Sequence, residues 1–195
     1  LQKDIAHGAV APCDIRLDGK PSVVSPVRTA PKGWRSEARR FVVNMRYVNS
    51  FIVEDEAPCS LDTLSKIRNM FCFHGIADSG AWGITLDLKS GYHNFLIHES
   101  QWDVMGIAIH TSELPPDAID HLRKTFPNCE DRQSSLFYFT MRALPFGLAP
   151  SCAVFSDIIT ALVAAWRRHR VCGTALRISS YIDDVVVVAP SARAA

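Results

Sequence analysis

Residues 178–188 read Ile-Ser-Ser-Tyr-Ile-Asp-Asp-Val-Val-Val-Val, so two adjacent acids stand between runs of β-branched and aromatic residues. Such runs favour β-strands, and the pattern predicts a hairpin with Asp183 and Asp184 at its tip. Asp-Asp supplies neither of the positive-φ residues that tight two-residue turns prefer, so turn chemistry alone does not explain the two acids. A functional role explains them better.

A third acid, Asp87, ends an apolar run at residues 84–88 that is typical of a separate strand. Two like charges held together are costly unless a cation is near, and carboxylate oxygens are ligands that Mg²⁺ takes. Two such ions, about 3.5 to 4 Å apart, can activate an attacking oxygen and stabilise a leaving one in phosphoryl transfer. The alternative is that Asp183 and Asp184 cap a solvated turn and Asp87 ends a surface strand. These residues alone leave both interpretations open.

The composition is that of a globular protein. The chain has 195 residues, of which 48% are hydrophobic and 21% charged, and these values exclude disorder, collagen and coiled coil. The net charge of +1 gives no global signal for nucleic acid or for cationic partners. Residues 1–50 nevertheless carry nine basic and four acidic side chains, so a basic first segment precedes a more acidic middle.

The six cysteines include no closely spaced pair, which argues against a zinc finger and favours a reducing, intracellular setting. The most apolar long stretch, residues 158–166, is far shorter than the roughly 20 residues of a membrane span, so we expect no membrane partner. The chain runs from Leu1 to Ala195 without an initial Met, and we expect it to be part of a longer polypeptide.

Hydrophobic periodicity predicts three helices. One begins at Ser60 and continues to about Met70, and a second begins at Pro116 and runs to about Phe126 within a spacer at residues 110–135. The third and clearest begins at Ser151, with a core face predicted to consist of Val154, Ile158 and Leu162. Short strands are predicted at residues 23–27, 41–43, 84–88, 104–109 and 136–142, with residues 1–36 otherwise in loops.

Four motifs resemble those of reverse transcriptases, and they occur along the chain in the same order as in that family. Residues 181–184, Tyr-Ile-Asp-Asp, are similar to the family's Tyr-x-Asp-Asp signature, and residues 86–93, Leu-Asp-Leu-Lys-Ser-Gly-Tyr-His, to its first metal-binding motif. Residues 143–150, Ala-Leu-Pro-Phe-Gly-Leu-Ala-Pro, resemble the template and nucleotide motif, and residues 40–49 the fingers strand. The amino-acid sequences of the motifs at residues 86–93 and 143–150 resemble those of retrotransposon enzymes, in particular those of tyrosine-recombinase elements of the DIRS type.

The resemblance implies an α+β fold: the fingers and palm of a right-hand polymerase, with an antiparallel palm sheet packed on helices and no thumb. It places the first part of the fingers at residues 1–83 and the first metal motif of the palm at 84–97. A second part of the fingers, with an insertion at about 110–135, would occupy residues 98–149. The helix and hairpin of a truncated palm would occupy residues 150–195.

The resemblance also implies a metal site. Asp87 and Asp183 would be ligands of two Mg²⁺ ions, for which Mn²⁺ could substitute, with the backbone carbonyl of Leu88 helping and Asp184 close by. The ions would activate a primer 3′-hydroxyl and neutralise charge on the α-phosphate. We therefore predict that replacing Asp87 or Asp183 by Asn abolishes nucleotide incorporation and leaves the fold intact.

Five further residues match positions that bind the incoming nucleotide. Tyr92 would lie beneath the sugar and exclude a 2′-hydroxyl, although a half-buried core tyrosine is the alternative. Lys32 and Arg40 would grip the triphosphate, since ammonium and guanidinium groups suit phosphate oxygens, although a loop lysine can equally be a solvated charge. Phe146 and Gly147 would line the nucleotide pocket.

The expected function is RNA-directed DNA polymerisation, with an RNA or DNA template, a primer and a deoxynucleoside triphosphate as partners. The thumb and ribonuclease H regions of the same polyprotein would lie outside the chain, so this fragment alone could be inactive. Two alternatives stay open: an inactive nucleic-acid-binding remnant and a Mg²⁺-dependent phosphohydrolase that uses the same acids. Four other acids are interpreted as a solvated face: Asp103, Asp117, Asp120 and Glu130.

Overall fold

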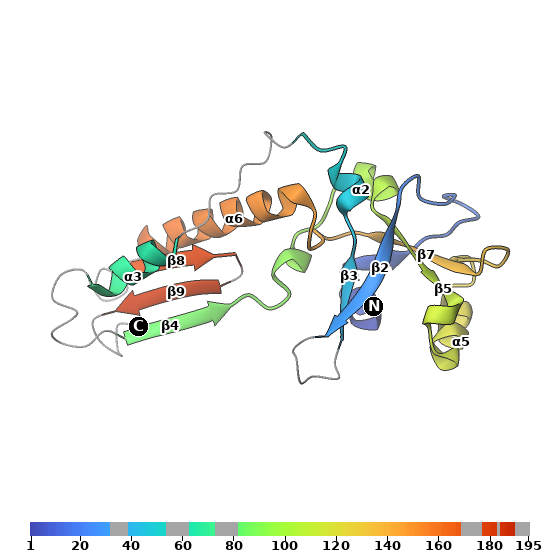
Figure 1. Cartoon of the computed structure of the whole chain (residues 1–195), viewed down its shortest axis with the longest axis horizontal. Helices are drawn as coiled ribbons and strands as arrows, with labels where there is room; N and C mark the ends of the chain where they lie inside the picture. Colours follow the sequence, from blue (N-terminus) through green and yellow to red (C-terminus); the bar gives the residue numbers. More distant parts are fainter. Residues whose placement is uncertain (32–38, 54–62, 73–81, 169–176, 183, 190–195) are drawn as a thin grey trace. The chain divides into compact units, whose positions relative to one another are not determined.

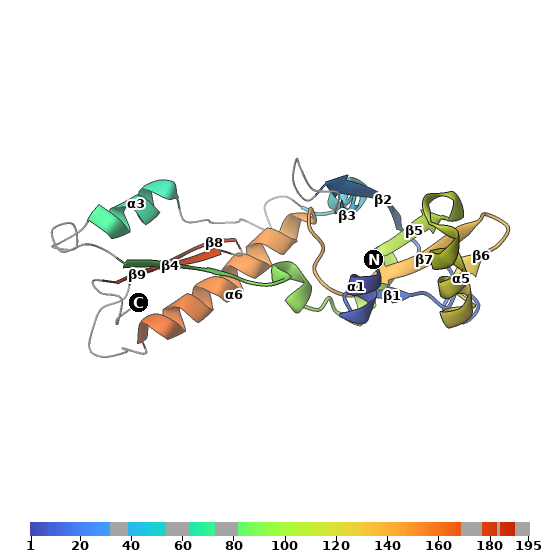
Figure 2. The same ribbon diagram turned by 90° about the horizontal axis from the view of Figure 1, so that it is seen from below.

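The computed structural model describes residues 1–31, 39–53, 63–72, 82–168, 177–182 and 184–189 of the chain, shown in two views in Figures 1 and 2. The chain divides into two compact units, and each is formed by two separate stretches of sequence. Unit 1 comprises Leu1–Val53 and Tyr92–Leu148, and unit 2 comprises Glu54–Gly91 and Ala149–Ala195.

Unit 1 is built on a mixed sheet with the strand order β1-β7-β5-β2-β3, in which β6 also pairs with β7. All of its strand pairs are antiparallel except β2 with β5, which run parallel. The strands are β1 (Val10–Pro12), β2 (Val24–Pro31), β3 (Arg39–Val43), β5 (Gly106–His110), β6 (Glu130–Asp131) and β7 (Leu136–Met141). Three of them lie at the predicted strands 41–43, 104–109 and 136–142, and β2 extends well beyond the predicted residues 23–27.

The core of unit 1 lies on its two central strands. Ile107 of β5 pairs with Phe139 of β7, Ile109 pairs with Phe137, and all four side chains are buried. Leu122 joins them from α5 (Pro116–Thr125). This helix has a proline in its first turn, where the missing N–H costs nothing, and the sequence predicted it there.

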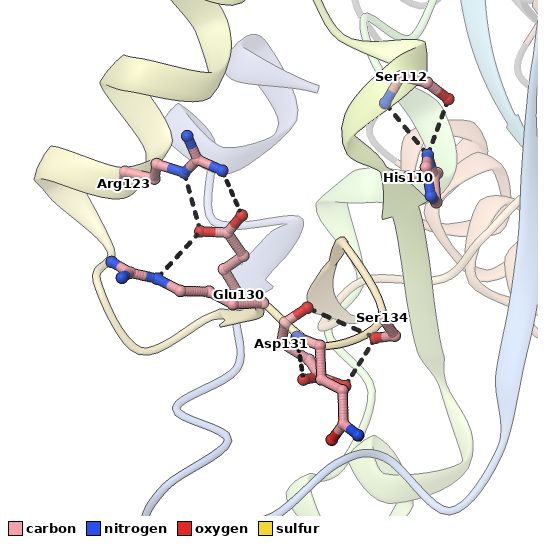
Figure 3. A network of polar contacts seen from close by, with 8 residues as sticks. His110, Ser112, Arg123, Glu130, Asp131 and Ser134 are labelled. Carbon is pink, nitrogen blue, oxygen red and sulfur yellow. Dashed lines mark hydrogen bonds and ion pairs between the residues drawn. The ribbon is translucent and has the colours of Figure 1, made fainter.

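An ion pair with a buried carboxylate joins α5 to β6 (Figure 3). The Glu130 side chain is only 3% exposed, and Arg123 of α5 donates to both of its oxygens at 2.9 and 2.7 Å. These hydrogen bonds lower the pKa of Glu130. The sequence-based interpretation of Glu130 as part of a solvated face is therefore wrong, because a cation seven residues earlier makes its burial possible.

Polar side chains also stabilise the turn after β6 and the starts of two short 3₁₀ helices. Lys20 and Ser134 donate to the carboxylate of Asp131 and hold its pKa at about 2. His110 caps the short helix η4 (Thr111–Glu113), since its Nδ1 accepts the backbone N–H of Ser112 (Figure 3). His98 caps η3 (Glu99–Val104) in the same way through Ser100.

Unit 2 contains a three-stranded antiparallel sheet with the order β4-β9-β8. Its strands are β4 (Trp82–Asp87), β8 (Arg177–Tyr181) and β9 (Asp184–Ala189), which agree with the predicted strand at 84–88 and the predicted hairpin. Two helices, α3 (Leu64–Cys72) and α6 (Ala149–Arg168), contact this sheet and lie on opposite sides of it in Figure 2. Consistent with cover on both faces, the consecutive residues Ile178 and Ser179 are both buried.

The orientation of α6 differs from the sequence-based expectation. The buried row of this helix consists of Phe155, Ile159 and Val163, which are at most 4% exposed. Val154 and Leu162, expected in the core, are 42% and 44% exposed, so the predicted face is wrong. Both rows are apolar and repeat every four residues, so periodicity could not distinguish them.

Residues 149–166 of α6 are long and apolar enough to cross a membrane by length and composition. This window of 18 residues is twice as long as the apolar stretch at residues 158–166. The helix contacts β8 and buries the row Phe155, Ile159 and Val163. The absence of a membrane partner stays a prediction.

Two short helices were not predicted from the sequence, α1 (Gln2–Ala6) and α2 (Arg46–Asn49), and a 3₁₀ helix, η2 (Gly91–Asn94), follows β4. The compact units also divide at other residues than the predicted subdomains do, since residues 54–91 fall in unit 2. Contact of α3 with β8, including a hydrogen bond from Arg177 Nη1 to the Met70 carbonyl, explains why this stretch groups with the sheet.

Candidate active site

Two of the three predicted acids face each other across neighbouring strands. Asp87 is the last residue of β4, Asp184 is the first of β9, and their Cα atoms are partners in the antiparallel ladder. Directly opposed residues place their side chains on the same face of a sheet, with Cβ atoms about 4.5 to 5.5 Å apart. Both residues are exposed. The fold therefore brings two carboxylates from distant parts of the sequence to one end of the sheet of unit 2.

The connection between β8 and β9 is short, because Tyr181 near the end of one strand pairs with Asp184 at the start of the other. Ile182 has φ of +54°, a left-handed conformation that costs energy for a β-branched residue. Strain of this kind concentrates at functional sites, because the surrounding structure must be arranged to maintain it. Asp183 itself lies outside the described residues.

The predicted carbonyl ligand follows directly after Asp87. The Leu88 oxygen accepts a hydrogen bond from the Gly91 N–H at 2.9 Å, which closes a turn with Ser90 at φ of +61°. A carbonyl oxygen has two lone pairs, so this bond leaves one available. The turn thus fixes the backbone immediately after the carboxylate of Asp87.

The donor set at this end of the sheet suits a hard cation, since it consists of carboxylate and carbonyl oxygens. Two opposed carboxylates also repel each other without a cation between them. Within the described part of the chain, no group of three His, Cys, Asp or Glu side chains is placed to hold a metal ion. The third predicted acid, Asp183, is outside that part.

Three predicted nucleotide-binding residues come together in unit 1. The rings of Tyr92 and Phe146 meet edge to face with centroids 4.6 Å apart, and Gly147 follows directly. Tyr92 is only 6% exposed, whereas Phe146 is 55% exposed. Gly147 has φ of +87°, and a Cβ there would meet open space, so the turn needs glycine for its conformation and not for lack of room.

Asn49, to which no role was assigned from the sequence, joins this group. Its Nδ2 donates to the Gly147 carbonyl at 2.8 Å and so ties the end of α2 to the turn. A hydrogen bond from Leu144 N–H to the Phe95 carbonyl attaches the same turn to the segment after Tyr92. Only the match of residues 40–49 to a family motif could have drawn attention to Asn49.

The side chains of the two residues predicted to bind the triphosphate, Lys32 and Arg40, are not described by the structure. Arg40 lies on β3, where its Cα pairs with that of Ala30, but its side chain lies outside the described part. Lys32 lies entirely outside the described residues. Their roles stay predictions.

Comparison with known families decides the classification. A family model described as reverse transcriptase (RNA-dependent DNA polymerase) matches residues 23–195. The chain belongs to the reverse transcriptase family. A reverse transcriptase domain implies a fingers and palm fold, and the mixed α and β structure agrees with it. It also implies nucleotidyl transfer with a nucleic acid template, a primer and deoxynucleotides as partners. No curated protein matches this reverse transcriptase chain significantly.

Proposed function

We propose that this chain is the fingers and palm part of a retroelement reverse transcriptase that adds deoxynucleotides to a primer 3′-hydroxyl by two-metal chemistry. The observation that carries the proposal is the pairing of Asp87 with Asp184 at the end of the β4–β9 ladder. Family membership supports the same activity in general terms.

The acids of the sheet would hold the metal. Asp87, Asp183 and the Leu88 carbonyl are the proposed ligands, with Asp184 beside them. When bound, two Mg²⁺ or Mn²⁺ ions supply an activated primer hydroxyl and neutralise charge on the α-phosphate and on the departing pyrophosphate. The β4–β9 ladder keeps the carboxylates of Asp87 and Asp184 on one face of the sheet, so little reorganisation accompanies metal binding.

The aromatic group of unit 1 would select the sugar. Tyr92 is held against Phe146, so its ring has little freedom to move aside for a 2′-hydroxyl. The exposed ring of Phe146 offers a surface for a sugar or base, and the bare backbone at Gly147 permits close approach. Lys32 and Arg40 are the proposed triphosphate ligands.

We further propose that unit 1 is the fingers and unit 2 the palm. Under this assignment residues 54–83 belong with the palm sheet, which α3 contacts, and the predicted boundaries shift accordingly. The thumb and ribonuclease H regions, the DIRS-type origin and the intracellular setting stay parts of the proposal that rest on the motifs and the cysteine pattern.

Primer extension by the full-length protein tests the proposal. We expect Mg²⁺-dependent incorporation of deoxynucleotides on a primed RNA template, abolished in Asp87→Asn and Asp183→Asn. Asp157→Asn, which alters an exposed acid of α6, is the matched control and should extend like the unaltered protein. Template binding without incorporation would favour an inactive remnant, and release of inorganic phosphate without extension would favour a phosphohydrolase.

A further inference from the structure

Two cysteines of unit 1 share one position along the edge of β7. The Cys13 N–H donates to the Tyr138 carbonyl at 3.1 Å, and the Tyr138 N–H donates to the Cys129 carbonyl at 2.8 Å. In an antiparallel ladder a single partner residue makes both of these bonds. Here Cys13, which follows β1, makes the bond to the Tyr138 carbonyl, and Cys129, which precedes β6, accepts the bond from the Tyr138 N–H. The two cysteines therefore lie side by side opposite Tyr138.

The chain segments around the two cysteines are bound to each other as well. The Ile15 N–H donates to the Asn128 carbonyl at 3.1 Å, and Asn128 Nδ2 donates to the Asp14 carboxylate at 2.9 Å. Residues 13–15 therefore run directly beside residues 128–129. The proximity of the two cysteines is built into the backbone and does not depend on one side-chain rotamer.

The side chains share one face of the sheet. A residue opposite Tyr138 projects to the face that carries Tyr138 and Thr140. The Cys13 Sγ lies 3.0 Å from Thr140 Oγ1, as this placement requires. Burial is the main reason why the pKa values of both thiols are raised, to about 11 for Cys129, and the nearby Cys13 raises the Cys129 value further.

We propose that Cys13 and Cys129 are a redox modification site and form a reversible disulfide that ties the N-terminal segment to the β6–β7 hairpin. A disulfide needs Cα atoms about 4.4 to 6.8 Å apart, and paired residues of adjacent strands have Cα atoms about 4.5 to 5.5 Å apart. Both cysteines are free thiols in this structure. The cross-link would close the long loop of residues 13–129, which includes residues 54–91 of unit 2, and would stabilise the fold by restricting the unfolded chain.

A small disulfide such as oxidised glutathione is the oxidant. The Cys13 thiolate is the more exposed of the two and attacks one sulfur of the small disulfide, which forms a mixed disulfide and releases one thiol. The Cys129 thiolate then attacks the Cys13 sulfur, forms the Cys13–Cys129 bond and releases the second thiol. Two protein thiols lose two protons and two electrons in total, and the small disulfide takes them up.

The raised pKa values make this reaction slow at neutral pH, because only a small fraction of each thiol is ionised. The rate should increase about tenfold per pH unit between pH 7 and 9, since the thiolate is the reacting form. This slow response distinguishes the pair from catalytic cysteines, whose pKa values are lowered.

Peptide mapping of the native chain tests the proposal. The protein is incubated with oxidised glutathione at pH 8.5, quenched with acid, alkylated and digested. We expect a peptide that links Cys13 to Cys129, a raised thermal midpoint, and reversal of both by dithiothreitol. Cys152→Ser is the matched control, because it removes another half-buried cysteine and should leave the linked peptide unchanged.

Two variants sharpen the result. Cys13→Ser should give no linked peptide, and Cys129→Ser should retain glutathione on Cys13. The proposal is overturned if the native protein links Cys13 or Cys129 mainly to other cysteines, or if glutathione persists on Cys13 while Cys129 stays reduced. Mapping of the unaltered protein decides between these outcomes even if a serine variant fails to fold.

Discussion

The side-chain amide of Asn49 donates a hydrogen bond to the Gly147 carbonyl and connects the end of α2 to the turn that carries Phe146. We expect Asn49→Ala to lower the free energy of unfolding by about 0.5 to 1.5 kcal/mol, the usual value of one such bond. Chemical denaturation measures this change. His121→Ala on α5 removes a side chain with no described role in the turn and should change stability by less than about 0.5 kcal/mol. Equal effects of both substitutions would contradict the structural role of Asn49.

The ion pair between Arg123 and Glu130 gives the fold a defined dependence on pH. Arg123 lowers the folded-state pKa of Glu130 below its unfolded value of about 4.3. The pair therefore stabilises the fold above that pH, and the contribution is lost as the pH falls through the folded-state pKa. Denaturation between pH 7 and pH 3 should show this loss, and Glu130→Gln should reduce the slope.

Arg132 provides the matched control for the same pair. It is 84% exposed and lies 3.9 Å from Glu130, whereas Arg123 makes two short hydrogen bonds to it. Arg123→Leu should cost about 1 to 3 kcal/mol at pH 7, because it leaves a buried carboxylate without its main partner. Arg132→Leu should cost less than about 0.5 kcal/mol. The reverse order would show that the burial of Glu130 does not depend on Arg123.

The two apolar rows of α6 should differ sharply in their contribution to stability. Ile159→Ala should lower the free energy of unfolding by about 2 to 5 kcal/mol, since it opens a cavity beneath the helix. Leu162→Ala, on the exposed row, should cost less than about 1 kcal/mol. Similar costs at both positions would indicate that Leu162 is covered after all.

The case of α6 shows where sequence reasoning succeeds and where it stops. The existence and type of α5, α6, β7 and the β8–β9 hairpin follow from hydrophobic periodicity, because each has a strong pattern of its own. The side of α6 that is buried cannot be predicted from periodicity, because two adjacent rows of its residues are both apolar. Only the packing of the helix in the fold determines which row is buried. Glu130 was misassigned for a related reason: burial of a charge depends on a partner that the local pattern does not reveal.

The candidate site was predictable to a similar extent. The strand register pairs Asp87 with Asp184, and the roles predicted for these acids stay predictions. The contact of Tyr92 with Phe146 joins two motifs that were recognised separately. The bond from Asn49 to Gly147 could not be predicted, because it depends on how the short helix α2 packs, and no periodic pattern marks a helix of four residues.

Sugar selection offers a test of Tyr92 in the full-length protein. Tyr92→Ala removes the ring and should reduce discrimination against ribonucleotides by about 10- to 200-fold, the range expected when a pocket loses a steric contact. Tyr92→Phe keeps the ring and its packing on Phe146 and should discriminate like the unaltered protein. Unchanged discrimination in Tyr92→Ala would show that the residue serves packing alone.

Asp87 and the adjacent acids Asp183 and Asp184 are proposed to share a divalent cation, and titration of the chain with Mn²⁺, followed by electron paramagnetic resonance, tests this proposal most directly. We expect saturable binding that weakens by at least about tenfold in Asp87→Asn and in Asp183→Asn, while Asp157→Asn binds like the unaltered chain. Equal Mn²⁺ affinity in all four proteins would contradict the shared site.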